Sequence, residues 1–316
     1  VQRMPRPDTI ARGDRDANVK ALRLRLASVK SIQRITKTMK MVAAAKLKGF
    51  QSRMIAARPL GDRITALVDA MPEALDEISA KDTTNVVIPF TSDRGLCGGV
   101  NGHVAKASKV LLADMPQDTT KIFIVGSKGE GLLRRTHGHM LVRTVQDAFG
   151  KPTSFALASE IAEEIVGSMK YDKATLVYNK FKSAIAYDTL SESVDSPETM
   201  EDRLAQIGER FEFDDEFTES LHLNDMMQFA LAAKVYSRML EAATSETSAR
   251  MQAMENATKN CGEMIDKLTL DMNKARQAVI TQELSEIVSG AAAVEQRARE
   301  GEGGRERERE RGGERG

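Results

Sequence analysis

The loop at residues 92–102, which reads SDRGLCGGVNG, holds the densest group of residues that could perform chemistry. Glycine-rich loops between a strand and a helix can hold phosphate on their backbone N–H groups. This loop lacks the Lys and Ser/Thr of a P-loop, and it does not match G-x-G-x-x-G. We therefore favour a tight strand-to-helix turn. An α/β enzyme that binds nucleotide or phosphate through residues 95–102 is kept as an alternative.

A second enzymatic interpretation makes Cys97 a nucleophile, because residues 95–99 read G-L-C-G-G and resemble a G-x-nucleophile-x-G turn. Such a turn carries its nucleophile directly after a strand, whereas six residues separate Phe90 from Cys97. His103 is the nearest histidine, and nothing else in the sequence marks it as a catalytic base. We therefore rank this interpretation below the simple turn.

Two further groups could bind metal or exchange protons. His137 and His139 form an H-G-H tripeptide without a third ligand nearby, which is typical of a solvated turn rather than of a metal site. Asp214, Asp215 and Glu216 lie in a polar segment with no apolar pocket to separate their pKa values, and we expect an exposed loop there. The sequence therefore predicts no catalytic residue, no bound cofactor and no metal site.

Composition limits the function classes further. The chain has 316 residues, enough for roughly two domains of about 150 residues. Aromatic residues make up 4% and tryptophan is absent, which disfavours aromatic-lined pockets and base-stacking surfaces. Basic and acidic residues both number 46, so no overall field attracts nucleic acid or an anionic membrane. The sequence contains no apolar run of about 18 residues that could span a membrane.

Residues 17–58 are predicted to form one long amphipathic helix, since apolar side chains recur at gaps of mostly three and four. Pro59 and Gly61 predict where this helix ends. Its polar face carries ten basic residues: Lys20, Arg23, Arg25, Lys30, Arg34, Lys37, Lys40, Lys46, Lys48 and Arg53. No Asp or Glu lies between the first and the last of these, so the basic side chains repel one another. We therefore expect this helix to bind an acidic partner.

Nucleic acid is one acidic partner that such a helix could bind. Basic residues and apolar seam residues interleave along it, however, which leaves little room for a face that enters the major groove. We expect no nucleic-acid partner, and we keep a basic-helix coiled coil that binds nucleic acid as an alternative.

Residues 224–298 are predicted to form a second long helix, because no proline interrupts them. Its heptad-like positions are Met254, Ala257, Cys261, Ile265, Leu268, Met272, Ala275 and Val279. A helix of this length does not fit inside a globular domain, so we expect a long antiparallel coiled coil with residues 17–58. Core helices of an ordinary bundle are the alternative.

The two ends of the chain differ from these helices. Residues 299–316 consist of Arg, Glu and Gly, and we expect this charged tail to be disordered. Residues 1–16 carry four arginines and start with Val1 rather than methionine. We treat them as an N-terminal extension, either the remnant of a cleaved presequence or part of the mature chain.

Residues 59–223 are predicted to form a small α/β domain. Strand-like runs lie at residues 85–90, 121–125 and 174–179, with a further strand between 184 and 193. Helical patterns separate them at residues 100–112 and 153–169. Because strands that alternate with helices pair in parallel, we expect an open, Rossmann-like sheet. The fold class is therefore α/β, with the long antiparallel coiled coil of the N- and C-terminal helices added to it.

Three segments carry a resemblance to a known family. They are SVKSIQRITKTMKMVAAAK at residues 28–46, SDRGLCGGVNG at 92–102 and NKARQAVITQELSEIVSGAAAV at 273–294. Together they resemble the gamma subunits of F-type ATP synthase. The third segment is the most specific, because six residues fall at the family's C-terminal spacing: Ile280, Thr281, Glu283, Glu286, Gly290 and Ala291.

The resemblance implies a rotor in the central stalk, not an enzyme. In that family the coiled coil turns inside a hexameric ring of alpha and beta subunits, one copy per complex, and the catalytic sites belong to the beta subunits. The α/β domain would form the foot, against the delta and epsilon central-stalk subunits and the membrane c-ring. The segment KMVAAAK at residues 40–46 and the arginines within residues 1–16 favour a mitochondrial member of the family. Such a member is peripheral to the inner membrane on its matrix side.

The resemblance also implies partner-contact residues. Met39, Lys40 and Met41 are similar to the family's contact point for acidic loops of the beta subunits. Arg276 and Gln277 occupy the family's place for hydrogen bonds to a beta-subunit loop, and Glu283 is assigned to partner contact with them. The family ends near Val294, so residues 299–316 are additional, and we expect them to project beyond the ring.

Overall fold

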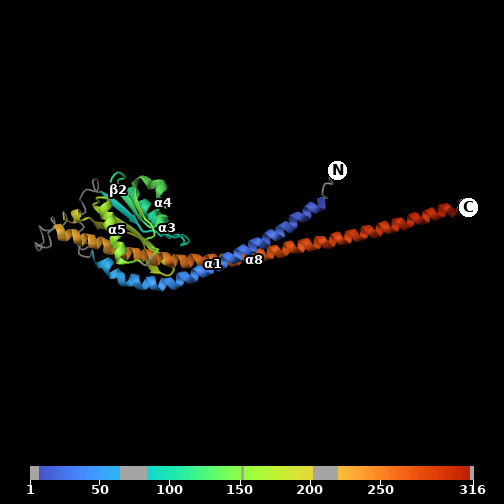
Figure 1. The fold of residues 1–316 in the computed structure, drawn as a ribbon, viewed down its shortest axis with the longest axis horizontal. Helices are drawn as coiled ribbons and strands as arrows, with labels where there is room; N and C mark the ends of the chain where they lie inside the picture. Colours follow the sequence, from blue (N-terminus) through green and yellow to red (C-terminus); the bar gives the residue numbers. More distant parts are fainter. Residues whose placement is uncertain (1–6, 65–83, 151–152, 202–219, 314–316) are drawn as a thin grey trace. The chain divides into compact units, whose positions relative to one another are not determined.

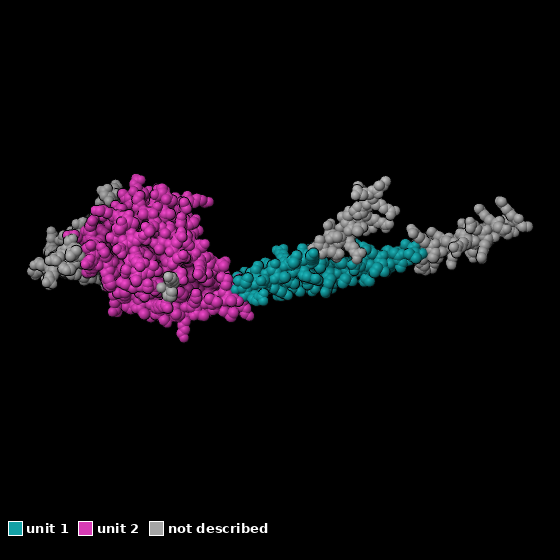
Figure 2. All heavy atoms as spheres, in the orientation of Figure 1, with its two compact units in different colours: residues 1–35, 257–316 teal, residues 36–256 magenta. Residues whose placement is uncertain are grey.

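The computed structural model describes residues 7–64, 84–150, 153–201 and 220–313, and gives side chains for residues 18–64, 84–150, 153–201 and 223–294. It divides into two compact units, residues 1–35 with 257–316 and residues 36–256, which Figure 2 colours separately. Two long helices belong to both units: α1, Pro7–Arg63, and α8, Ser220–Gly313. Among the described helices, none is both long and apolar enough to cross a lipid bilayer.

The second unit is built on a five-stranded sheet in the order β3-β2-β1-β4-β5. The strands are β1, Asn85–Pro89; β2, Thr120–Val125; β3, Leu141–Val145; β4, Lys173–Ser183; and β5, Ala186–Asp195. The first four pair in parallel, which confirms the predicted open sheet. The last strand returns antiparallel to β4 as a hairpin.

Side chains along each strand point alternately to the two faces of the sheet, and each face has its own hydrophobic core. On one face Val87, Ile122 and Ile124 pack against α3, Val100–Asp114, and α4, Ser127–His137. On the other face a larger core joins the sheet to α5, Phe155–Ser168, and to the first turns of α8. Figure 1 shows the sheet between these helices. The sheet is thus buried on both sides, as parallel sheets require.

Helix α4 and strand β3 were not predicted from the sequence. Helix α4 has glycines at positions 129 and 131 and is strongly polar, so its helical pattern is weak. A short 3-10 turn, Gly138–Met140, connects it to β3, which is a sheet edge with three of its five side chains only partly buried. An edge strand needs less apolar patterning than a central strand, which is why the sequence signal was missing.

In the first unit α1 and α8 pack along a narrow seam. Leu26, Val29 and Leu268 are buried there. Leu22, Cys261, Ile265 and Met272 are partly buried around them. The residue numbers rise along one helix as they fall along the other, so the pairing is antiparallel, and the predicted coiled coil is confirmed. Ile32 and Ile35, which the periodicity also placed in the seam, are half exposed.

The helices extend beyond the predicted limits of 17–58 and 224–298. Helix α1 begins at Pro7, where proline suits a first helical position, and it continues through Pro59 to Arg63. Proline at 59 leaves only the carbonyl of Ile55 without its donor, and that residue lies on the exposed side of the helix. Helix α8 continues to Gly313, past residue 299, where we expected the charged tail to begin. Arg and Glu are good helix formers.

Candidate functional site

The loop after β1 is closed by its own side chains. Asn101 accepts a hydrogen bond from the Ser92 backbone N–H at 2.8 Å and donates from its amide to Ser92 Oγ at 2.8 Å. Ser92 Oγ in turn donates to the carbonyl of Arg94 at 2.6 Å. Leu96 and Gly98 adopt a φ of 64°, the left-handed conformation that lets the loop reverse before α3. The favoured interpretation as a tight strand-to-helix turn agrees with this geometry.

Asp93 anchors the loop to two other segments of the sheet domain. Its carboxylate accepts hydrogen bonds from the N–H groups of Ser127, Asp147 and Phe149 at 3.0, 3.1 and 2.9 Å. Ser127 is the first residue of α4, so the carboxylate lies at a helix N-terminus, where a negative charge is favourable. The carboxylate thus ties the loop to the start of α4 and to the segment after β3. Asp93 lies within the loop that the sequence marked, but nothing in the sequence indicated this role.

Cys97 is poorly placed for nucleophilic chemistry. The residue is 2% exposed, and its Sγ lies 3.6 Å from Ser92 Oγ and accepts from the Asn101 amide at 3.4 Å. Burial raises the pKa of the thiol, with the hydrogen bond to Ser92 opposing the shift, so the reactive thiolate is disfavoured. His103 instead shares a 3.0 Å hydrogen bond with Tyr187 Oη.

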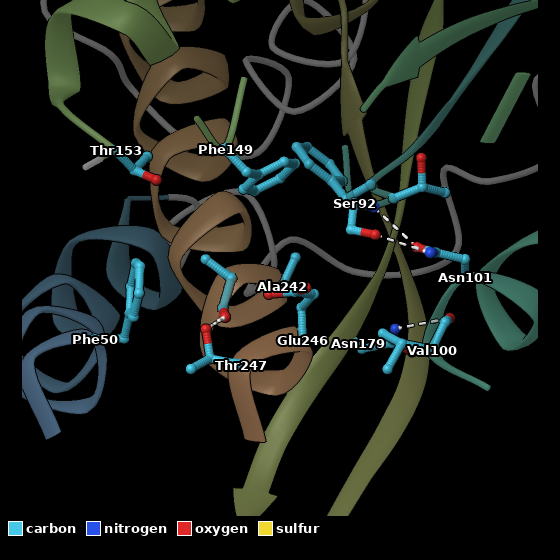
Figure 3. Close-up of a pocket in the computed structure, with 13 residues that line it drawn as sticks. Phe50, Ser92, Val100, Asn101, Phe149, Thr153, Asn179, Ala242, Glu246 and Thr247 are labelled. Carbon is cyan, nitrogen blue, oxygen red and sulfur yellow. Dashed lines mark hydrogen bonds between the residues drawn. The ribbon is translucent and has the colours of Figure 1, made fainter. Parts of the chain in front are cut away.

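Helix α8 fills the crevice in which open α/β sheets bind ligands. Such ligands lie beyond the carboxyl ends of the strands where the strand order reverses, here between β1 and β4. Ala242, Glu246 and Thr247 of α8 stand beside Ser92 and Asn179 at this position (Figure 3). The cavity that remains is about 40 Å³, room for no more than a few water molecules. A nucleotide does not fit there.

The three predicted contact residues of α1 lie close to the start of the second unit. Met39 is half-buried, Met41 is 56% exposed, and Lys40 forms an exposed ion pair of 2.6 Å with Glu255 of α8. Of the ten basic side chains from Lys20 to Arg53, nine are exposed and Lys40 is partly exposed. This part of α1 therefore has a basic surface, and Lys40 is already paired with Glu255 of the same chain.

Beside Met39 lies a hollow of about 270 Å³ with mixed charge. Its basic lining residues are Lys46, Arg94 and Arg250, and its acidic ones are Asp93 and Glu246. Arg250 and Glu246 are paired with each other along α8, and Asp93 is bonded to the backbone as described above. The other two basic residues, Lys46 and Arg94, are exposed. The hollow therefore adds to the basic character of this side of α1.

The predicted contact residues of α8 lie in the first unit. Arg276 and Gln277 are exposed, and Glu283 is half-buried. Beyond them four apolar residues that the sequence analysis had not singled out as a surface are 47–68% exposed: Ile280, Leu284, Ile287 and Val288. Their spacing of three and four residues continues the helical periodicity past Val279, and this signal could have identified them. The end of α8 thus carries an exposed apolar stripe within the described residues.

Comparison with known proteins relates the chain to one family. A family model described as ATP synthase matches residues 18–294. The mitochondrial ATP synthase subunit gamma of Arabidopsis thaliana is 38% identical over 291 residues, covering 90% of this chain and 87% of its own length. The corresponding Drosophila melanogaster protein is 39% identical, with coverage of 88% and 91%. The ATP synthase gamma chain of Paramagnetospirillum magneticum is 36% identical, with coverage of 88% and 100%.

Solved structures show the same fold. The rotor of the Euglena gracilis mitochondrial ATP synthase contains a chain that matches with a TM-score of 0.72 at 22% identity, covering 84% of this chain and 99% of that one. A chain from the central stalk and c-ring of the Tetrahymena thermophila mitochondrial ATP synthase matches with a TM-score of 0.60 at 29% identity, with coverage of 71% and 99%. This chain therefore shares its fold with both of these chains.

Proposed function

This chain belongs to the family of ATP synthase gamma subunits, and from that membership we propose how it works in an F-type ATP synthase. It is the rotor subunit of the central stalk and is not itself an enzyme. One copy turns inside a hexameric ring of alpha and beta subunits, whose beta subunits carry out ATP synthesis. Its foot, the sheet domain, meets the small central-stalk subunits and the c-ring, through which proton flow drives rotation.

The mechanism is differential binding. An asymmetric shaft makes different contacts with each beta subunit, so every orientation stabilises a different set of open and closed sites. Rotation then forces product release, and ATP hydrolysis drives it backwards. The exposed basic face of α1 supports this mechanism, because it suits acidic loops of the beta subunits. The exposed apolar stripe at residues 280–288 of α8 suits rotation inside an apolar sleeve.

Six residues are proposed to carry the partner contacts. Met39, Lys40 and Met41 meet the acidic loops of a beta subunit, with Met41 supplying exposed apolar area. The exposed side chains of Arg276 and Gln277 hydrogen bond to a second beta-subunit loop, and Glu283 contributes a contact from the next turns of α8. The two groups of residues thus lie on different helices and meet different parts of the ring.

We place the protein in mitochondria, peripheral to the inner membrane on its matrix side. Gamma subunits of plant, insect and mammalian mitochondria support this location, at 38–39% identity. Bacterial gamma chains match nearly as well, at 36–38%.

The family match over residues 18–294 is the observation that carries the proposal. A tagged chain purified from detergent-solubilised membranes tests it directly. Alpha and beta subunits should be recovered in fixed stoichiometry with the tagged chain, and the chain alone should bind no ATP at micromolar concentrations. Tight ATP binding by the purified chain would contradict the rotor and favour the phosphate-binding alternative at residues 95–102.

Charge reversal of Lys40 tests the contact on α1. In the assembled synthase, Lys40→Glu should lower the number of protons pumped per ATP hydrolysed by about fivefold, because two acidic surfaces then face each other. Nucleotide affinity of the beta subunits should stay normal. Proton pumping and ATP hydrolysis are measured side by side in membrane vesicles.

A control separates the partner contact from the ion pair within the chain. Glu255→Gln removes only that ion pair. It should leave the pumping ratio close to that of the unaltered protein. A loss of the same size in Glu255→Gln would assign the effect to the internal pair and remove Lys40 from the contact surface.

A further inference from the structure

A cluster of charged side chains, of which Lys234, Arg238 and Glu241 are buried and the others partly exposed, joins α1, α8 and the sheet within the second unit. We call it the buried ion cluster. Its members are Arg58 and Asp62 of α1, Tyr178 of β4, Glu192 of β5, and Lys234, Arg238 and Glu241 of α8. None of these residues was singled out by the sequence analysis, and none belongs to the partner contacts proposed above. The cluster therefore needs an explanation of its own.

Arg238 is the centre of the cluster. Its guanidinium is 2% exposed and donates to Glu192 at 2.8 and 3.0 Å and to Asp62 at 2.9 Å. It also lies over the ring of Tyr178, 4.9 Å from the ring centre, and the Tyr178 hydroxyl donates to Glu192 at 3.0 Å. Burial acts to lower the pKa of Arg238, but Tyr178, Glu192 and Asp62 outweigh it and raise the pKa above its usual value. One side chain thus links both long helices to the sheet.

Glu241 forms a second link one turn further along α8. Its carboxylate is fully buried and accepts from Arg58 Nε at 2.5 Å and from the Phe181 N–H at 2.8 Å. Arg58 also donates to the Phe181 carbonyl at 2.8 Å, so both helices are hydrogen bonded to the end of the same strand. The hydrogen bond to Glu241 raises the pKa of Arg58.

Buried ion pairs add little net stability, because the loss of hydration offsets most of the attraction. Their effect on register is larger, because separating the partners leaves uncompensated charges in the interior. A slip of α8 by one turn would separate Arg238 from Glu192 and Glu241 from Arg58 together. The surrounding apolar contacts, of Leu47, Met54 and Leu240 among others, do not select a register so sharply.

Close helix packing at the same level adds a steric constraint. Gly61 of α1 lies directly against Ser237 of α8, and a Cβ atom on Gly61 would overlap the Ser237 side chain. The two helices therefore approach each other most closely beside Arg238. A rotation of either helix about its own axis would bring a larger side chain into this contact.

We propose that the buried ion cluster is the junction that transmits torque between the sheet domain and the two helices, with Arg238 and Glu241 as its positioning residues. The proposal rests on the rotor function stated above. Force applied to the sheet reaches α1 and α8 through bonds to β4 and β5, and neither helix can slip without exposing several buried charges to an apolar interior. The cluster makes the helix pair turn with the sheet as one body.

The test measures coupling in the assembled synthase in membrane vesicles. Arg238→Met keeps an unbranched apolar stem and removes the charged guanidinium, and the ratio of protons pumped to ATP hydrolysed should fall about threefold or more. Arg238→Lys, which keeps the charge, should recover part of the ratio. The matched control is Arg134→Met on α4, where the arginine is 74% exposed and paired with Glu130. A purely stabilising role would lower the amount of assembled enzyme and leave the ratio unchanged.

Each outcome decides the proposal. An unchanged ratio in Arg238→Met, or an equal fall in Arg134→Met, overturns it. Where Arg238→Met does not assemble, Asp62→Asn serves instead, because Asp62 is half exposed and its loss leaves the core intact. A lowered ratio in Asp62→Asn supports the junction, and an unchanged ratio overturns it. Failure of the rotor function itself is distinguishable, because the unaltered chain would then not assemble with the ring at all.

Discussion

At the scale of single residues, contacts within one loop were predictable from the sequence, whereas contacts between distant segments were not. The loop residues Ser92, Cys97 and Asn101 were recognised as a group, and their mutual hydrogen bonds agree with the predicted turn. Asp93 was not identified, because its donors lie 34 to 56 residues away in the sequence. Likewise Lys40 was assigned by resemblance, and its bond to Glu255, 215 residues distant, had no local signal. Contacts of this range follow from the fold and not from any neighbouring pattern.

The two cysteines should differ in reactivity. Cys97 is buried and has a raised pKa, whereas Cys261 on α8 is only half-buried. At pH 8 we expect iodoacetamide to modify Cys261 at least about tenfold faster than Cys97. The rate at Cys97 should continue to rise with pH beyond the usual range of a thiol, because its thiolate forms later. Mass spectrometry of peptides from the isolated chain measures both rates, and equal rates at the two sites would contradict the burial of Cys97.

At the scale of elements, apolar periodicity identified the two long helices and four of the five strands. Their ends were less predictable, because Pro59 is tolerated inside α1 and the Arg/Glu repeat continues α8 to Gly313. Helix α4 and strand β3 lie where the sequence is polar and glycine-rich, so tertiary packing rather than propensity decides their structure. The stripe of apolar side chains from Ile280 to Val288 required a structure to show that it is exposed.

Glycine at two helical positions gives a prediction about the α1–α8 packing. Gly61→Ala should lower the free energy of unfolding by about 1–3 kcal/mol, because the added methyl group overlaps Ser237 and separates the helices. Gly49→Ala is the matched control on the same helix, with no atom near the new methyl group. It should instead stabilise by up to about 1 kcal/mol. Urea unfolding of the isolated chain measures both, and a neutral Gly61→Ala would disprove the close approach.

At the scale of the whole molecule, the two units differ in the size of their cores. The seam of the first unit buries three apolar side chains within the described residues, whereas the sheet domain buries more than twenty on one face alone. Helix pairs with so little buried apolar area open locally far more often than a two-sided sheet. The two units should therefore have different local stabilities.

Hydrogen exchange measures this difference. In the isolated chain, backbone amides at residues 22–35 and 257–272 should exchange at least about tenfold faster than those of β1 and β2. Mass spectrometry of peptic peptides provides both values in one experiment, with α5 as an internal standard for a helix covered by a large core. Equal protection in the two sets of peptides would show that the seam is stronger than its buried side chains indicate.

The way α8 occupies the crevice at the strand ends has a consequence for biosynthesis. Leu231, Val235 and Met239 complete the larger core of the sheet, yet the ribosome makes them after every strand has emerged. Until then the part of this apolar face that α5 does not cover stays open, in the state most prone to aggregation. The core of the domain is therefore complete only after α8 has been made. A chain that ends before residue 223 would leave that part of the face uncovered.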